Sequence, residues 1–280
     1  MKNIKSSFFS IGIAIALVSA CTTKPESDLT LSGLNPAAFD TIINEKPVKL
    51  YTLKNSNGME VCITNFGGRV VSLVVPDKNG KPTDVVLGYD NITQYADTVN
   101  SPSDFGSSVG RYANRINKGQ LTIDGNRIQL PTNNFGHCLH GGPSGWMYQV
   151  YDANLLNDST LQLNIVSPDG DNGFPGTVKA TTTYTLCSDN TLDIVFEATT
   201  DKETVINMTN HSYFNLNGDP SKEGMDMILY INADNFTPAD STYMTTGEIK
   251  SVDGTPMDFR KAHAIMETIN DTTFDQIKNA

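Results

Sequence analysis

One histidine of this chain lies among small polar residues and β-forming residues, in the segment Thr209–Leu216. Its neighbours Asn210, Ser212 and Tyr213 bring hydrogen-bonding groups and an aromatic ring, which together suit the orientation of a sugar. Imidazole has an unperturbed pKa of about 6.5, so it can give and take protons near neutral pH. An isolated strand histidine is more often structural, but these neighbours make His211 a candidate proton donor for a small polar substrate.

A second polar segment, Gly110–Ile116, carries two arginines. Arg115 follows Asn114, and its planar guanidinium keeps its charge and offers several donors. It can therefore hold sugar hydroxyls without taking part in proton transfer. The alternative of a surface ion pair fits Arg111 better than Arg115.

A third segment places His140 directly before Gly141-Gly142, where the chain can turn sharply and bring its backbone close to a ligand. A histidine beside such a turn is often structural, and both interpretations stay open. His137 lies three residues earlier, so the two rings could form half of a metal site. The surrounding residues supply no third ligand, and we therefore predict no metal.

Two acidic segments allow alternative interpretations. Asp258, between Met257 and Phe259, could accept hydrogen bonds from two neighbouring hydroxyls, or it could form a structural salt bridge with Arg260. The loop Ser167–Gly176 is rich in acids, but its glycines and acids do not follow the spacing of a calcium-binding EF-hand. We interpret it as a rigid, turn-rich loop.

The elements that must position these residues are short β-rich runs, which begin at Val48 and alternate with turns. Outside the N-terminal segment there is no long amphipathic helix and no internal repeat. The pattern predicts an all-β sandwich with the functional residues in loops or at strand ends. Three of the predicted turns are residue pairs that tolerate positive φ angles, namely Asn57-Gly58, Asn79-Gly80 and Asp124-Gly125. The fourth is Ser188–Asn190, between the runs 177–186 and 192–198.

The N-terminal residues have the features of an export signal. Lys2 and Lys5 precede an apolar run from Phe8 to Ala20, which is too short to span a bilayer comfortably. Residues 18–21 resemble a bacterial lipobox, in which Cys21 becomes the lipidated first residue. We expect a lipoprotein signal peptide over residues 1–20, a tether over 21–46 and a sandwich over 47–280. The alternative is an ordinary signal peptide or a buried helix.

Composition excludes several classes of function. The 280 residues carry a formal net charge of −11, which opposes binding to nucleic acids. Apart from Cys21, the three cysteines cannot all pair, and no CxxC spacing supports structural zinc. Neither a phosphate-binding loop nor a dinucleotide fingerprint occurs, so we expect no nucleotide cofactor.

The four motifs, taken in order, resemble those of aldose 1-epimerase, the galactose mutarotase family. The resemblance begins near Tyr51, includes Asn65–Gly68 and Val85–Tyr89, and runs to about Arg260. It implies a large antiparallel β-sandwich, the galactose mutarotase-like supersandwich, with an open sugar cleft and no cofactor. The order of the motifs is far more specific than any single one.

The resemblance also implies roles for individual residues. Asn114, Arg115, His140 and Asp258 are expected to hold sugar hydroxyls. His211 is expected to be the general acid that protonates the ring oxygen, and Tyr213 to line the cleft. Ring opening, rotation and reclosure then exchange the two anomers, with an acid and a base at opposite ends of the hemiacetal.

One departure from the family pattern concerns the general base. The family has a glutamate for this role downstream of the Asp258 motif, and this sequence stops at Ala280. Glu267 is too close to Asp258 and lacks the motif's surroundings, so the role is not assigned to it. We therefore expect a sandwich that is incomplete at its C-terminus and an impaired epimerase. The alternative is a non-catalytic sugar-binding lipoprotein, whereas a phosphosugar epimerase would need more basic residues.

Overall fold

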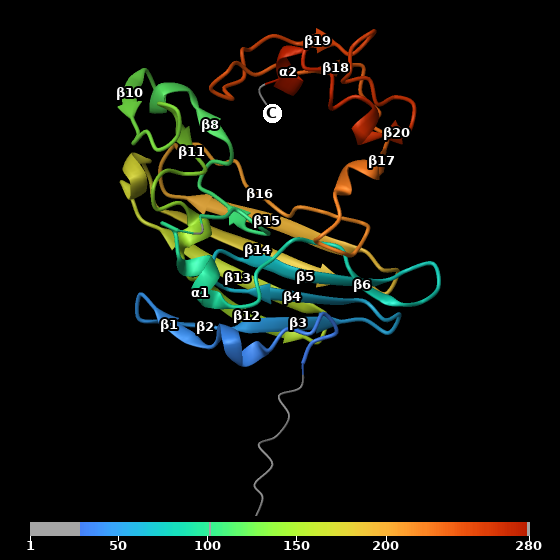
Figure 1. Ribbon diagram of the computed structural model, residues 1–280. Coiled ribbons are helices and arrows are strands. Elements are labelled where there is room, and N and C mark those ends of the chain that lie inside the picture. The colour runs from blue at the N-terminus through green and yellow to red at the C-terminus, as the bar shows by residue number, and fades with distance from the viewer. Residues whose placement is uncertain (1–28, 101, 279–280) are drawn as a thin grey trace, which may run out of the picture.

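The computed structural model describes residues 29–100 and 102–278, and two four-stranded antiparallel sheets form its centre (Figure 1). Each sheet is a meander in which sequential strands are neighbours, as hairpin connections favour. The first sheet contains β3 (Leu50–Lys54), β4 (Glu60–Thr64), β5 (Arg69–Pro76) and β6 (Pro82–Asp84). The second contains β12 (Asp152–Asn157), β13 (Thr160–Ser167), β14 (Val178–Leu186) and β15 (Leu192–Thr200).

The main hydrophobic core lies between these two sheets. On β13 and β14 every second side chain is buried, which is the period-2 pattern of a strand with one covered face. Leu161 and Leu163 from the second sheet join Val61 and Ile63 from the first in one cluster. Burial of each such side chain stabilises the fold by about 1.5–3 kcal/mol. The predicted antiparallel sandwich is thus present in the central part of the chain.

The turns predicted from glycine-containing pairs are confirmed. Asn57-Gly58 joins β3 to β4, and Asn79-Gly80 joins β5 to β6. Gly58 has a φ of 84°, a value that costs little for glycine alone. Ser188–Asn190 joins β14 to β15. The third pair, Asp124-Gly125, joins β9 (Gln120–Ile123) to β10 (Asn126–Gln129).

Residues 29–46 differ from the expected tether. They form the short helix η1 (Pro36–Phe39) and the paired strands β1 (Thr41–Ile43) and β2 (Lys46–Val48). Phe39 has no exposed surface and packs in a second core cluster with Leu34 and Tyr95. The segment is rich in polar residues, but its apolar side chains, Leu34 and Phe39 among them, pack against the sandwich. The predicted signal peptide, Cys21 and the rest of the tether lie outside the described residues.

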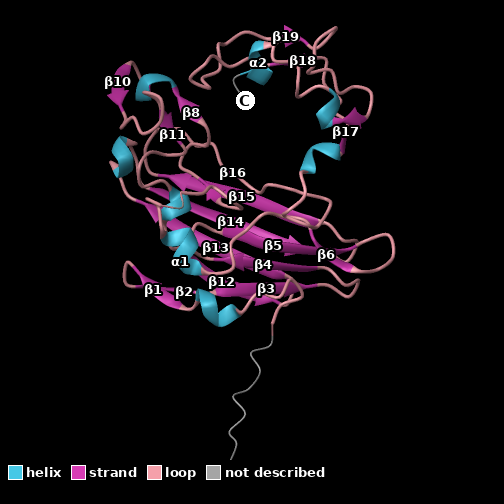
Figure 2. Cartoon of the chain, in the orientation of Figure 1, coloured by secondary structure: helices cyan, strands magenta, loops and turns pink. Residues whose placement is uncertain are grey.

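The C-terminal segment lies apart from the two sheets, although the sequence had placed it in the sandwich. It forms an arch above them in Figure 1, and Figure 2 shows that most of the arch is loop. Its strands have two residues each and pair among themselves. They are β17 (Ile228–Leu229), β18 (Asn235–Phe236), β19 (Lys250–Ser251) and β20 (His263–Ala264), and helix α2 (Asp275–Lys278) follows.

Four further two-residue strands connect the sandwich to its loops. They pair as β7 (Ser108–Val109) with β16 (Thr209–Asn210), and as β8 (Arg115–Ile116) with β11 (Cys138–Leu139). No helix in the described part of the chain is long and apolar enough to cross a membrane. The remaining helical turns are α1 (Ile92–Ala96), η2 (Asn117–Gly119), η3 (Trp146–Tyr148), η4 (Asp171–Gly173), η5 (Gly224–Asp226) and η6 (Ile265–Glu267).

Candidate active site

Backbone pairing between β7 and β16 places His211 beside the segment that precedes β7. The backbone N–H of His211 donates to the carbonyl of Ser107 at 2.8 Å, and its carbonyl accepts from Gly106 at 3.0 Å. The Asn210 side-chain amide also donates to the Gly106 carbonyl, at 2.8 Å. The polar residue before His211 therefore fixes the local backbone, and the imidazole is set at the end of a strand.

The pairing of β8 with β11 places His140 next to Asn114. The backbone N–H of His140 donates to the Asn114 carbonyl at 3.1 Å, and His140 Nδ1 accepts from the Asn114 backbone N–H at 2.9 Å. The following residue, Gly141, has a φ of 83°, and a Cβ there would lie 2.3 Å from the carbonyl oxygen of Gly110. The glycine therefore permits the close turn that holds the ring of His140 in place.

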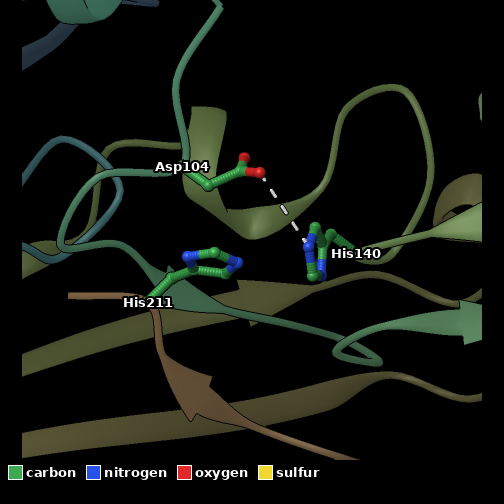
Figure 3. Close-up of side chains that lie close together, drawn as sticks. All are labelled: Asp104, His140 and His211. Atoms are coloured by element: carbon green, nitrogen blue, oxygen red, sulfur yellow. Dashed lines mark ion pairs between the residues drawn. The ribbon is translucent and has the colours of Figure 1, made fainter. Parts of the chain in front are cut away.

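These two pairings bring His140 and His211 together. Their ring centroids are 5.2 Å apart and the rings are nearly perpendicular, with an interplanar angle of 89°. Asp104 completes the group, with its Oδ2 atom 3.9 Å from His140 Nε2 (Figure 3). One ligand atom from each of the three residues lies within 4.8 Å of the others. The result is a compact group of two imidazoles and one carboxylate.

His140 is a neutral hydrogen-bond donor at neutral pH. Its side chain is mostly buried, and this burial lowers its pKa to about 4; His211 and Arg115 also lower it, while the Asp104 carboxylate opposes the shift. Since Nδ1 accepts a hydrogen bond from Asn114, the neutral ring carries its proton on Nε2. The Nε2–H group thus points its proton to the side of Asp104.

The tautomer of His140 distinguishes between two possible roles of the three residues, metal binding and hydrogen bonding to a small ligand. Two imidazoles and a carboxylate at these distances resemble a set of metal ligands. A metal ion needs the Nε2 lone pair of His140, but that nitrogen holds the proton while Nδ1 accepts from Asn114. The donor set therefore does not fit a metal, and its chemistry is hydrogen bonding and proton transfer to a small ligand.

Tyr213 extends the group as an aromatic wall. Its ring centroid lies 5.2 Å from that of His211 and 5.2 Å from that of Phe105. The side chain is 44% exposed, so one face remains open to a ligand. Partial burial and the charge of Asp104 raise the pKa of its hydroxyl, which therefore stays protonated at neutral pH.

Arg115 lies on the neighbouring strand and is held by polar and aromatic contacts. Its guanidinium donates to Asn134 Oδ1 at 2.7 Å and to Asn114 Oδ1 at 3.3 Å. The ring of Tyr243, from the C-terminal segment, lies 5.2 Å from Arg115 Cζ. Desolvation lowers the pKa of Arg115 from that of a free guanidinium. Asn114 thus contributes its backbone to His140 and its side chain to Arg115.

A cavity of about 410 Å³ adjoins Asp104 and Tyr213. This size falls in the range of about 300–1,000 Å³ that small-molecule sites have. Its wall combines aromatic rings with amide and carboxylate groups, as a polyol ligand requires. The polar and aromatic members of the wall include Tyr89, Asp104, Asn133, Asn134, Tyr148 and Tyr213.

Asp258 is paired with Arg260 in the C-terminal segment. Its carboxylate accepts from Arg260 Nε at 2.9 Å and from Arg260 Nη2 at 2.7 Å, and these bonds lower its pKa to about 2. In the described part of the chain it makes no hydrogen bond or ion pair with His140, His211 or Arg115. The structure therefore shows the salt bridge that the sequence allowed as one alternative.

Two residues differ from what sequence reasoning indicated. Asp104 was not identified, because nothing in its local sequence, between Ser103 and Phe105, distinguishes it from the other acidic residues of the chain. A surface ion pair was the alternative that fitted Arg111 better than Arg115, but Arg111 is buried. Its guanidinium donates to carbonyls of the loop 167–176, which is held rigid in this way.

Comparison with known proteins places the chain in context. The aldose 1-epimerase family model matches residues 49–279. Galactose mutarotase from Sus scrofa is 40% identical over 206 residues, which are 74% of this chain and 59% of that protein. Aldose 1-epimerase from Escherichia coli strain K12 is 38% identical over 220 residues, which are 79% of this chain and 62% of that protein.

Solved structures agree with these matches. The GalM/aldose epimerase homologue from C. elegans superposes with a TM-score of 0.75 at 34% identity, over 80% of this chain and 67% of that one. Galactose 1-epimerase from Lactobacillus acidophilus NCFM gives a TM-score of 0.76 at 30% identity, over 85% and 69%. The chain spans about 60% of the length of the curated relatives it matches. With matches that cover most of its residues, the chain belongs to the aldose 1-epimerase family.

Proposed function

We propose that this chain is an aldose 1-epimerase, which interconverts the α and β anomers of free hexoses such as galactose or glucose. The observation that carries the proposal is the group of His140, His211 and Asp104 beside the open face of Tyr213. Membership of the family supports it, as do relatives that are named galactose mutarotase and aldose 1-epimerase.

In the proposed reaction His211 donates a proton to the ring oxygen of the sugar. The bond from that oxygen to the anomeric carbon breaks, and a base takes the proton of the anomeric hydroxyl as the carbonyl forms. Rotation and reclosure give the other anomer. His140 stays neutral and donates its Nε2–H to a sugar oxygen, and Arg115 holds a further hydroxyl without changing its charge.

The base is not assigned to Glu267. This side chain is exposed, and its Oε1 atom accepts from the backbone N–H of Ala264, which closes its own helical turn. Asp258, which the resemblance assigns to hydroxyl binding, is paired with Arg260 and carries no step here. We therefore propose that turnover by these 280 residues is weaker than that of the curated relatives. Sugar binding without turnover is the alternative.

Polarimetry on freshly dissolved α-anomer, with a calorimetric sugar titration alongside, tests the proposal. The wild-type chain should accelerate mutarotation, and His211→Asn should lose about 100-fold or more of that acceleration, the usual contribution of a general acid. Asp158→Asn, in an exposed turn, serves as the matched control. Binding without acceleration would select the non-catalytic alternative, and absence of both would reject a sugar site.

We also propose that the protein is an exported bacterial lipoprotein anchored through Cys21. The support is the basic, apolar and small-residue sequence of positions 1–21, which lie outside the described residues. Metabolic labelling with radioactive palmitate should mark the wild type and not Cys21→Ala, and the variant should leave the membrane fraction. An unlabelled wild type would contradict the anchor.

A further inference from the structure

Asp104 is a carboxylate whose capacity to accept hydrogen bonds is largely unused. Within residues 29–100 and 102–278, its side-chain oxygens accept no hydrogen bond, and Oδ2 lies 3.9 Å from His140 Nε2, which is beyond hydrogen-bond distance. The side chain is only 30% exposed. An ionised carboxylate has about four lone-pair positions to satisfy, and partly buried ones usually find donors. A ligand that carries hydroxyl groups can supply them.

The backbone around Asp104 is held by a buried arginine. Arg69 has no exposed surface, and its Nη1 donates to the carbonyls of Ser103 and Phe105, each at 3.0 Å. The carbonyl of Asp104 itself accepts from the backbone N–H of Ser107 at 3.1 Å and from its hydroxyl at 2.9 Å. Both neighbours of Asp104 and its own carbonyl are thus fixed, and such support is typical of a preorganised binding residue.

The surroundings of the carboxylate favour a neutral polyol. Asp104 lines the cavity together with Asn134, Tyr148 and Tyr213. Burial raises the pKa of both tyrosines, and the charge of Asp104 adds to the rise. Among the residues that the structure describes, no lysine or arginine forms an ion pair with it, and His140 is neutral at neutral pH. A ligand with its own negative charge would meet repulsion here.

We propose that Asp104 contacts the substrate and determines its specificity, accepting hydrogen bonds from one or two hydroxyls of the bound aldose and disfavouring sugars with an anionic substituent. The inference rests on the proposed function, because it places the aldose against the same group of two imidazoles and one carboxylate. It adds a substrate contact that the sequence motifs did not indicate.

The first test measures affinity for galactose by NMR or calorimetric titration in the wild type, Asp104→Ala and Asp104→Asn. A hydrogen bond to a charged group is worth a change of about 10- to 100-fold in the dissociation constant, so Asp104→Ala should bind galactose that much more weakly. Asp158→Asn removes the same charge from an exposed turn and should bind like the wild type. Melting temperatures show that each variant is folded.

A panel of monodeoxygalactoses identifies the hydroxyl concerned. For the sugar that lacks the partner hydroxyl, the wild type and Asp104→Ala should bind with equal affinity, whereas the other deoxy sugars should keep the difference. Equal losses for every deoxy sugar would indicate a general structural effect and would overturn the proposed contact.

The second test uses charge. Asp104→Asn keeps the size of the side chain but removes its charge, so it should narrow the preference for galactose over galacturonate by about 10-fold, the scale of one charged hydrogen bond. A preference that does not change would overturn the specificity role. A wild type that binds no aldose overturns the proposed function as well, whereas a wild type that binds, with Asp104→Ala unchanged, overturns this inference alone.

Discussion

The central strands and the C-terminal segment of this chain are both short of helix, yet they are held by different forces. On β13 and β14 side chains alternate between buried and open positions, and Leu163 has no exposed surface. In residues 228–278 the strands have two residues each, and Ile249 is 75% exposed. Hydrophobic burial fixes the first region, whereas turns and ion pairs dominate the second.

The site lies outside the two central sheets, but three of the four short strands that position its members, β7, β8 and β11, carry buried side chains as the central strands do. β7 and β16 set His211, and β8 and β11 set His140. The C-terminal segment contacts the neighbourhood of the site at two residues. The ring of Tyr243 lies over the guanidinium of Arg115, and the hydroxyl of Thr242 lies 2.9 Å from His137 Nε2. The comparison therefore predicts that the placement of the site side chains depends more on the packing of the sandwich than on the C-terminal segment.

The largest expected difference between the regions is in core packing. Leu163→Ala should lower the free energy of unfolding by about 2–5 kcal/mol, since it leaves a cavity between the sheets. Ile249→Ala should change it by no more than about 0.5 kcal/mol, as exposed positions do. Urea unfolding curves measure both values. Equal losses would show that the C-terminal segment is packed as tightly as the sandwich.

A second difference follows from the low pKa of His140. In the unfolded chain the ring takes a proton near pH 6.5, but in the fold it does so only near pH 4, because burial disfavours the charged form. Its contribution to stability is thus complete above pH 6.5 and declines as pH falls to about 4. The loss is on the order of 3 kcal/mol at most.

The pH dependence is measured by urea unfolding at several pH values between 4 and 7. His140→Asn has no titrating ring, so its stability should fall less steeply over this interval than that of the wild type. A variant that keeps the full wild-type slope would assign the acid sensitivity to other groups and would contradict a buried neutral His140.

Some of this architecture follows from sequence alone because its causes are local. The hairpin turns depend on residue pairs that tolerate positive φ, and the period-2 pattern of residues 177–186 gives the face of β14. The interval 29–46 differs from the predicted tether because its apolar residues, among them Leu34 and Phe39, follow no clear periodicity and yet are buried. The average composition of residues 29–46 does not reveal which of their side chains are buried.

The site could be predicted only in part, because proximity across the chain leaves no local signal. His211 and His140 are 71 positions apart, and it was the order of family motifs that associated them. Asp104 comes to them through the pairing of β7 with β16, which two-residue strands do not reveal in a sequence. Asp258 lies two residues from Arg260, so the salt bridge between them could be predicted from the sequence as the alternative to hydroxyl binding.

A third difference concerns two glycines with similar backbone. Gly141 and Gly247 have φ angles of 83° and 85°, but a Cβ at Gly141 would lie 2.3 Å from the Gly110 carbonyl, and one at Gly247 meets nothing within 4 Å. Gly247→Ala should cost about 1 kcal/mol, and Gly141→Ala should cost about 1–2 kcal/mol more. Thermal unfolding compares them. If the two variants lose the same stability, the turn after His140 is not as closely packed as the structure shows.

The smallest expected effect is that of Asp258→Asn, in the C-terminal segment, on the binding of galactose. The Asp258 carboxylate already accepts three hydrogen bonds from Arg260, two from its guanidinium and one from its backbone N–H, and Arg260 also pairs with Asp234 and Asp253. Because these bonds occupy its oxygens, Asp258→Asn should weaken galactose binding less than Asp104→Asn does in the same titration. A larger loss for Asp258→Asn would mean that the C-terminal segment rearranges to place Asp258 on the sugar, and that the sandwich alone does not define the site.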